Sequence, residues 1–182
     1  AIASGLIFGA FVGYLTSAQQ IFQEHYGLGI HFPLYFAVLA LAIGSAAYAN
    51  ARLVMRYGMH ALSGVALIAL STLSLIFFGV AYAVAGDPPL WGLMAYLMIA
   101  FFFIGILFGN FNALAMEPMG HIAGVAAAVV GTAQSLISTW VGTWIGQSYD
   151  GTVLPLVGGF TALGMTSLAI VHWAERGRKA GG

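Results

Sequence analysis

The stretch YANARLVMRYGMH, residues 48–60, separates two long apolar runs. It contains Arg52 and Arg56, two of only five Lys and Arg residues in a chain of 182. Of all residues, 61% are hydrophobic and 5% are charged, whereas soluble domains carry about 25% charged residues. A chain of this composition cannot cover itself with a polar surface, so we expect lipid to be its solvent.

Apolar runs of membrane-spanning length follow one another along the whole chain. A transmembrane helix needs about 20 predominantly apolar residues, and proline near the edge of such a helix costs little. The sequence therefore predicts an all-α membrane protein, a single domain of residues 1–182 with six transmembrane helices in a bundle. The predicted spans are residues 1–22, 33–53, 59–85, 90–116, 122–145 and 153–174.

The charges predict the orientation of the chain. All five basic residues lie at or beyond the ends of the second and the sixth span, which finish on the same side of the membrane. The connections after the first, third and fifth spans, on the opposite side, carry only acidic charge. By the positive-inside rule the basic side is cytoplasmic, so we expect both termini in the cytoplasm. The basic residues are Arg52, Arg56, Arg176, Arg178 and Lys179, and the acidic residues opposite them are Glu24, Asp87 and Asp150.

The chain begins with Ala, and its first span has no basic flank of the kind that a signal peptide carries. We therefore expect this span to be an internal helix of a longer protein, or a helix that lacks an upstream segment.

Small residues recur at steps of three and four along several spans, which places them on one face of each helix. In lipid, such faces let helix backbones approach and gain dispersion contacts. We expect them to serve packing, with a ligand passage as the alternative, and the weaker stripes of the third and sixth spans predict peripheral helices. The packing glycines are Gly5, Gly9, Gly13, Gly44, Gly105, Gly109, Gly131, Gly142 and Gly146.

Few polar side chains lie inside the spans, where they are costly and often functional. Gln134 is near the middle of the fifth span, and both a ligand contact and an interhelical hydrogen bond stay open for it. Asn110 and Asn112 are two residues apart, so they point to nearly opposite faces, and we expect structural hydrogen bonds from them. Ser17 is a further intramembrane polar residue of the first span.

Several classes of function are not expected. Asp, Glu, Lys, Arg and His occur only at span ends or in connections, which disfavours a membrane haem protein and leaves no titratable group to carry protons across. Glu117 and His121 are interrupted by Pro118 and Gly120, so they do not form a helical metal pair. Without cysteine or a nucleophile motif we expect no enzyme, cofactor or metal, and the zero net charge predicts no nucleic-acid partner.

Two segments resemble a known family. NARLVMRYG (residues 50–58) and NALAMEPMGHIAGVAAAVVGTAQ (residues 112–134) are similar to the C-terminal half of major facilitator superfamily transporters, in particular the Bcr/CflA-type drug:proton antiporters. The resemblance covers all six spans in order and is weakest in the third and sixth. It implies a half-domain of 3+3 inverted repeats in the bacterial inner membrane.

The resemblance also implies roles for particular residues. Arg52, Arg56 and Gly58 correspond to a degenerate copy of the family's cytoplasmic loop motif, from which the Asp is missing. In the family the first, second, fourth and fifth helices of this half line a central cavity. The substrate-cavity residues expected here are Phe11, Tyr14 and Gln134, facing lipophilic small molecules.

Two functions remain open on the sequence. The first is half of a proton-coupled multidrug transporter, with the proton-carrying acids in a second six-helix half on the same polypeptide or another chain. The alternative is a structural or accessory subunit that packs in a larger membrane complex and no longer transports. In either case we expect the faces of the first and fifth spans to meet a partner, and the remaining surface to meet membrane lipid.

Overall fold

The computed structural model describes residues 2–117 and 122–180. The described residues form helices and no strand, and six helices are long and apolar enough to cross a membrane. This confirms the predicted all-α class and indicates an integral membrane protein. The helices are α1 (Ile2–Gln19), α2 (Phe32–Tyr57), α3 (Met59–Ala83), α4 (Leu90–Met116), α5 (Ala123–Gln147) and α6 (Leu154–Ala180), with a π-helical turn η1 (Gln20–His25) and a 3-10 turn η2 (Gly29–His31) between α1 and α2.

The end of α2 differs from the prediction. The helix continues to Tyr57 rather than 53, so Arg52 and Arg56 lie on its last turns and not in a connection. Basic side chains are favourable at a helix C-terminus, so nothing ends the helix at the first arginine. It ends at Gly58, whose φ of 79° and ψ of 157° lie in a region that is essentially restricted to glycine.

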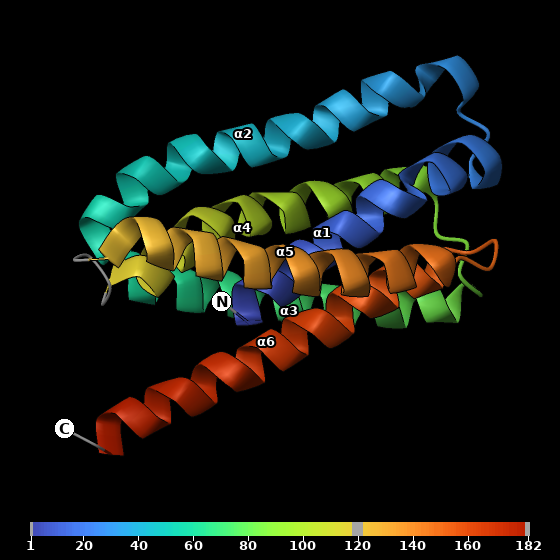
Figure 1. Ribbon diagram of the computed structural model, residues 1–182. Helices are drawn as coiled ribbons and strands as arrows, with labels where there is room; N and C mark the ends of the chain where they lie inside the picture. Colours follow the sequence, from blue (N-terminus) through green and yellow to red (C-terminus); the bar gives the residue numbers. More distant parts are fainter. Residues whose placement is uncertain (1, 118–121, 181–182) are drawn as a thin grey trace.

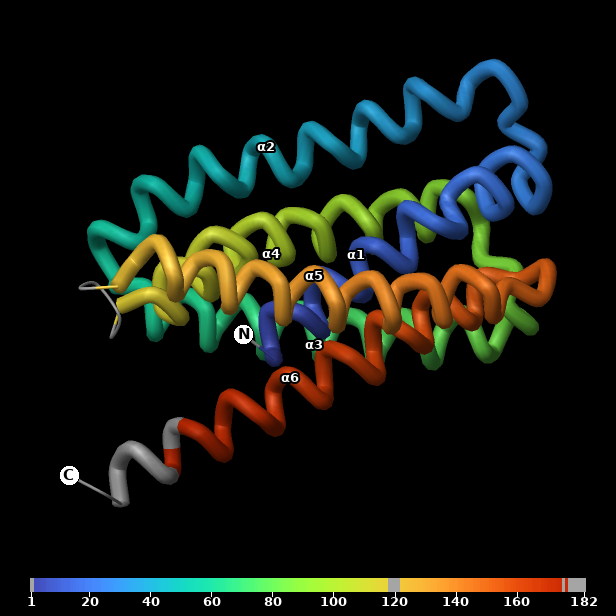
Figure 2. Tube along the Cα trace, in the orientation of Figure 1, coloured from blue at the N-terminus to red at the C-terminus, as the bar shows by residue number. Residues whose placement is uncertain are grey.

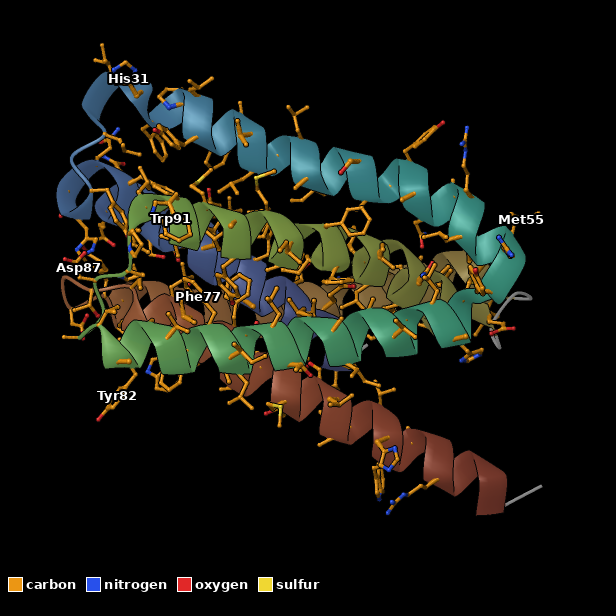
Figure 3. All side chains as sticks on the ribbon, turned by 180° about the vertical axis from the view of Figure 1, so that it is seen from behind. His31, Met55, Phe77, Tyr82, Asp87 and Trp91 are labelled. Atoms are coloured by element: carbon orange, nitrogen blue, oxygen red, sulfur yellow. The ribbon has the colours of Figure 1, made fainter. Side chains whose placement is uncertain are left out.

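The helices alternate in direction, so the molecule has two distinct ends (Figure 1). We call the end with the α2–α3 connection the basic end, because it carries Arg52 and Arg56. The opposite end, with the α1–α2, α3–α4 and α5–α6 connections, is the acidic end. Asp87 at the acidic end and Met55 near the basic end mark this separation in Figure 3.

α1 and α4 form the centre of the bundle. α1 packs against α5 and α6, α4 packs against α2 and α3, and α3 packs against α6. Half of the span is buried in α1 and in α4 (50% each), compared with 17% in α2 and 22% in α5. Figure 2 shows α2 and α6 on opposite sides of the bundle, with the later part of α6 leaving it toward the basic end.

These values correct two expectations. α3 and α6, which were expected to be peripheral, are 33% and 28% buried and so are better covered than α2 and α5. The face of α1 that was expected to meet a partner is already covered, because its small residues pack against α5 in the same chain. The least covered helices of this chain are therefore α2 and α5.

The α1–α5 contact is a close seam of glycines. A Cβ added at Gly5, Gly9 or Gly13 would lie 3.0, 3.3 or 2.9 Å from a side-chain carbon of Ile137, Val141 or Ile145, respectively. The residue numbers increase in the same direction along both helices, so α1 and α5 run parallel and in a fixed register. Gly142 and Gly146 lie on the α5 side of the seam, against Val12 and Thr16.

The other predicted packing glycines divide into two groups. Gly105 of α4 lies against Ala46 of α2, at 2.6 Å for an added Cβ, and Gly109 lies beside Asn50 at 3.6 Å. An added Cβ at Gly44 or Gly131 would meet no described atom within 4 Å. Those two glycines take no part in a close contact within the described chain, because they lie on the open faces of α2 and α5.

The connections at the acidic end are tied to one another. His25 Nε2 lies 3.1 Å from Asp87 Oδ1, and the Tyr26 hydroxyl donates a 2.6 Å hydrogen bond to the Pro88 carbonyl. Tyr26 lies between the spans, and burial, with a smaller contribution from the Asp87 carboxylate, raises its pKa to about 12. The neutral phenol that donates to Pro88 is thus the stable form. The α1–α2 and α3–α4 connections are thereby joined.

Candidate ligand groove

Aromatic rings from three helices gather on one side of the bundle. Tyr14 of α1 lies with its ring centroid 4.7 Å from Phe101 of α4 and 6.0 Å from Phe36 of α2, and Phe11 lies 5.4 Å from Phe101. Toward the basic end, Phe8 of α1 pairs with Phe108 of α4 at 5.1 Å. The rings come together because α1 and α4 are neighbours at the centre of the bundle and α2 packs against α4 beside them.

Two adjoining cavities run along these rings, and we call them together the aromatic groove. The larger has a volume of about 380 Å³ and the smaller about 40 Å³, and Phe11 and Ile43 line both. Among the described residues, no charged side chain lines either cavity. The larger cavity is lined by Phe8, Phe11, Ile43, Ala47, Asn50, Ile104, Gly105, Phe108 and Gly109, and the smaller by Phe11, Tyr14, Phe36, Leu39, Ala40, Ile43 and Phe101.

Tyr14 has an unsatisfied hydroxyl at the small cavity. The residue is 1% exposed, and its OH has no hydrogen-bond partner among the described residues. A buried hydroxyl without a partner is costly. By contrast, the buried Tyr96 of α4 stacks on Phe77 and shares a 3.0 Å hydrogen bond with Ser74. The free donor of Tyr14 is therefore a feature of this site and not of buried tyrosines in this chain generally.

An amide pair stands at the other end of the groove. Asn50 Nδ2 donates to Asn110 Oδ1, and Asn110 Nδ2 donates to Asn50 Oδ1, both at 3.0 Å. Asn110 is 2% exposed, whereas Asn50 is half-buried and lines the larger cavity. The pair holds α2 to α4 and fixes the orientation of the Asn50 amide.

The structure brings together only two of the three residues that were expected in the cavity. Phe11 and Tyr14 lie in the aromatic groove. Gln134 is buried in α5, eleven residues before Ile145, which packs against Gly13. At a rise of 1.5 Å per residue, Gln134 lies about 17 Å along the helix axis from the level of Ile145 and Gly13, which is next to Tyr14. Gln134 therefore does not line the same site.

The other intramembrane polar residues also lie outside the groove. Ser17 is buried and donates a 2.8 Å hydrogen bond to the Gly13 carbonyl of its own helix. Asn112 is half-buried and makes no side-chain hydrogen bond to a described residue. The expected interhelical hydrogen bond thus exists at Asn110 but not at Asn112. Asn110 faces α2, and Asn112, two residues further along α4, points to a nearly opposite side of the helix.

Sequence reasoning missed Asn50, although its signal was present. Asn50 is an amide inside the predicted second span, three residues before its predicted end, and this is the kind of signal that singled out Asn110. Phe8, Phe36 and Phe108 were missed for another reason. Aromatic residues are frequent in every span, and only the tertiary arrangement shows which of them face one another.

The predicted loop motif forms a helix end with aromatic support. The Arg52 guanidinium lies 4.6 Å from the ring centroid of Tyr48, and that of Arg56 lies 5.3 Å from the ring of Tyr57. Neither arginine forms an ion pair within the described part of the chain. Such Tyr–Arg pairs are typical of a membrane–water interface. Of the Glu117–His121 pair, His121 lies outside the described residues.

The open face of α5 carries hydroxyl groups at membrane depth. Four exposed residues at helical spacing form what we call the hydroxyl face, namely Thr132, Ser135, Thr139 and Thr143. No hydrogen bond from these hydroxyls is found within the described chain. Beside them Trp140 is 81% exposed. This face is polar and unsatisfied where a lipid-facing helix is apolar.

Neither the groove nor the rest of the described chain contains three His, Cys, Asp or Glu residues that could hold a metal together. Among the described residues that line the groove, only Tyr14 and Asn50 carry a polar side-chain group. Comparison of the chain with family models, with curated proteins and with solved structures found no match.

Proposed function

We propose that this chain is one six-helix half of a secondary active transporter that moves lipophilic small molecules. The observation that carries the proposal is the larger cavity of the aromatic groove, which has a volume of about 380 Å³ at membrane depth and, among its described lining residues, one polar side chain, Asn50. Ligand cavities typically have volumes of about 300–1,000 Å³, with mostly apolar walls and a few placed polar groups.

The pattern of helix contacts supports an inverted repeat. Exchanging α1, α2 and α3 with α4, α5 and α6 maps the α1–α5 contact onto α4–α2 and the α1–α6 contact onto α4–α3. Because α1 and α4 run in opposite directions, the two three-helix units are inverted relative to each other. Inverted repeats of this kind occur in secondary transporters of the major facilitator type, to which the two sequence segments are similar.

The proposed location is the bacterial inner membrane, with the basic end and both termini in the cytoplasm. The chain has no cysteine, so single-cysteine variants can test this orientation. A membrane-impermeant maleimide added to intact cells is expected to label Asp150→Cys and not Arg56→Cys. The reverse pattern would contradict the orientation.

Energy coupling is proposed to lie in a second half. No Asp, Glu, Lys or Arg of this chain lies in the middle of a span, and a proton carrier must be titratable and accessible from both sides. The open faces of α2 and α5 are the surfaces where a second half would pack, on the same polypeptide or on another chain.

The direct test is transport by the assembly that contains this chain. We expect proteoliposomes of the assembly purified from native membranes to show proton flux that depends on an aromatic drug, and Phe11→Ala to reduce that flux severalfold. Leu75→Ala is the matched control, because Leu75 is exposed on α3, away from the groove. Absence of drug-dependent flux in the wild-type assembly would contradict the proposal.

The hydroxyl face of α5 favours a second candidate, a structural or accessory subunit in a larger membrane complex. Unsatisfied hydroxyls at membrane depth gain more from a protein neighbour than from lipid, and this holds whether or not the neighbour is a transporter half. Under this alternative the assembly shows no drug-dependent flux, and removal of the chain loosens a larger complex.

A further inference from the structure

We propose that the aromatic groove selects an uncharged aromatic ligand that carries an amide or similar carbonyl group, and that Asn50 recognises this group. The inference rests on the proposed function only in treating the groove as the ligand surface. It adds the chemical class of the ligand and a specificity-determining residue.

The amide pair does not use the full hydrogen-bonding capacity of Asn50. Each asparagine amide has two N–H donors and two acceptor lone pairs, and the reciprocal pair uses one donor and one lone pair of each residue. No other described residue bonds to the Asn50 side chain. One N–H and one lone pair of Asn50 therefore remain unused at the wall of the cavity.

The unused N–H and lone pair of Asn50 are accessible from the larger cavity. Gly109 has no side chain where a Cβ would lie 3.6 Å from Asn50 Nδ2, and Gly109 itself lines the cavity. Asn110 is deeply buried and does not line it. A ligand in the cavity thus meets one donor and one acceptor from a single amide whose orientation its partner holds.

The lining of the cavity suits an amide better than a lipid chain or a cation. A lipid acyl chain would leave the free N–H and lone pair of Asn50 unpaired in an apolar site, which is unfavourable. A cation would find no carboxylate in the lining, and an unpaired buried charge is more costly still. An amide offers both a complementary acceptor and a complementary donor, while Phe8 and Phe108 offer aromatic surfaces beside it.

The test measures binding without any gradient, using the assembly reconstituted in lipid nanodiscs. The probes are benzanilide, trans-stilbene, which has a similar shape without the amide, and the cation tetraphenylphosphonium. Protein-free nanodiscs correct for partition into lipid. The N–H and the carbonyl of benzanilide point in opposite directions, so one of them bonds to Asn50 at a time. With one hydrogen bond at stake we expect benzanilide to bind about fivefold more tightly than either other probe.

Three variants locate the effect. Asn50→Leu combined with Asn110→Leu replaces both partners, so no buried amide is left unpaired and folding is preserved, and we expect benzanilide and stilbene to bind equally. Ala47→Trp fills the cavity and is expected to abolish binding of both, whereas Ala51→Trp, exposed on the same helix but outside the lining, is expected to change neither.

Three results would overturn the inference: equal binding of benzanilide and stilbene to the wild type, tighter binding of the cation, or amide selectivity that survives both the double replacement and Ala47→Trp. The proposed function fails separately. Amide-selective binding without drug-dependent proton flux would retain this site and reject the transporter, and flux without amide selectivity would do the opposite.

Discussion

At the scale of single residues, Tyr14 and Tyr96 are both buried but differ in one hydrogen bond. The hydroxyls of Tyr96 and Ser74 form a hydrogen bond, whereas the Tyr14 hydroxyl has no partner among the described residues. Removing an unsatisfied buried hydroxyl is favourable, and removing a bonded one is not. On this ground the two hydroxyls are expected to contribute to stability with opposite sign.

We expect Tyr14→Phe to raise the free energy of unfolding by about 1 kcal/mol and Tyr96→Phe to lower it by about the same amount. The measurement is unfolding by sodium dodecyl sulfate in mixed micelles, followed by circular dichroism. Equal losses of stability in the two variants would show that Tyr14 has a bonding partner in the membrane-embedded protein.

At the scale of helices, the sequence was sufficient for the existence of each helix but not for its neighbours. Six apolar runs predict six spans because a span needs only length and composition. Gly44 and Gly105 look alike in sequence, yet only Gly105 meets another helix. A stripe of small residues shows only that another helix could approach closely on that face. Whether a neighbouring helix lies there depends on tertiary contacts, which the stripe does not predict.

The glycines of α5 provide a matched test of this point. A Cβ at Gly142 would lie 2.6 Å from Val12 Cβ and 3.0 Å from the Gly13 backbone nitrogen, which cannot move aside, whereas a Cβ at Gly131 meets nothing within 4 Å. We expect Gly142→Ala to destabilise the chain by about 1–3 kcal/mol through overpacking. Gly131→Ala should leave stability unchanged or raise it by up to about 1 kcal/mol through helix propensity.

The same unfolding assay in mixed micelles compares the two variants. A similar effect of both substitutions would mean that α1 and α5 do not meet along the glycine seam.

The connections at the acidic end are expected to respond to alkaline pH through Tyr26. The pKa of Tyr26 is raised to about 12, above the ordinary value of about 10, so its hydrogen bond to Pro88 is fully present below pH 10. Stability is lost as pH rises from 10 through 12, because the unfolded chain ionises first and the phenolate cannot donate.

The difference in absorbance at 295 nm between the wild type and Tyr26→Phe isolates this titration, and we expect its midpoint near pH 12. Asp87→Asn should move the midpoint down, because it removes the smaller of the two causes of the shift. A midpoint at the ordinary pKa of tyrosine in the wild type would show that the contact to Pro88 is not maintained.

At the scale of the whole molecule, sequence reasoning failed where it needed the register between helices. Gln134 and Tyr14 are each polar residues inside a span, and nothing in the sequence separates them. The parallel register of α1 and α5 places them about 17 Å apart along the axis. Of the amide pair, the sequence singled out Asn110 inside its own span but not its partner Asn50, which lies 60 residues away in the chain.

The open faces of α2 and α5 make the strongest prediction about the intact assembly. If they meet protein, residues on them are shielded in native membranes, whereas α3 contacts lipid. The chain has no native cysteine, so a photoactivatable maleimide can be placed at Thr139→Cys on the hydroxyl face and at Ile76→Cys, which is 62% exposed on α3. We expect a protein adduct from Thr139→Cys and only lipid adducts from Ile76→Cys.

The mass of the protein adduct then separates the two candidate functions. A product with a second six-helix unit, on another chain or within one longer polypeptide, supports the transporter and directs attention to proton flux. A product with a subunit of a larger, unrelated membrane complex supports the accessory role. If Thr139→Cys yields only lipid adducts, both proposals fail together, because each requires a protein neighbour to satisfy the hydroxyls that α5 presents at membrane depth.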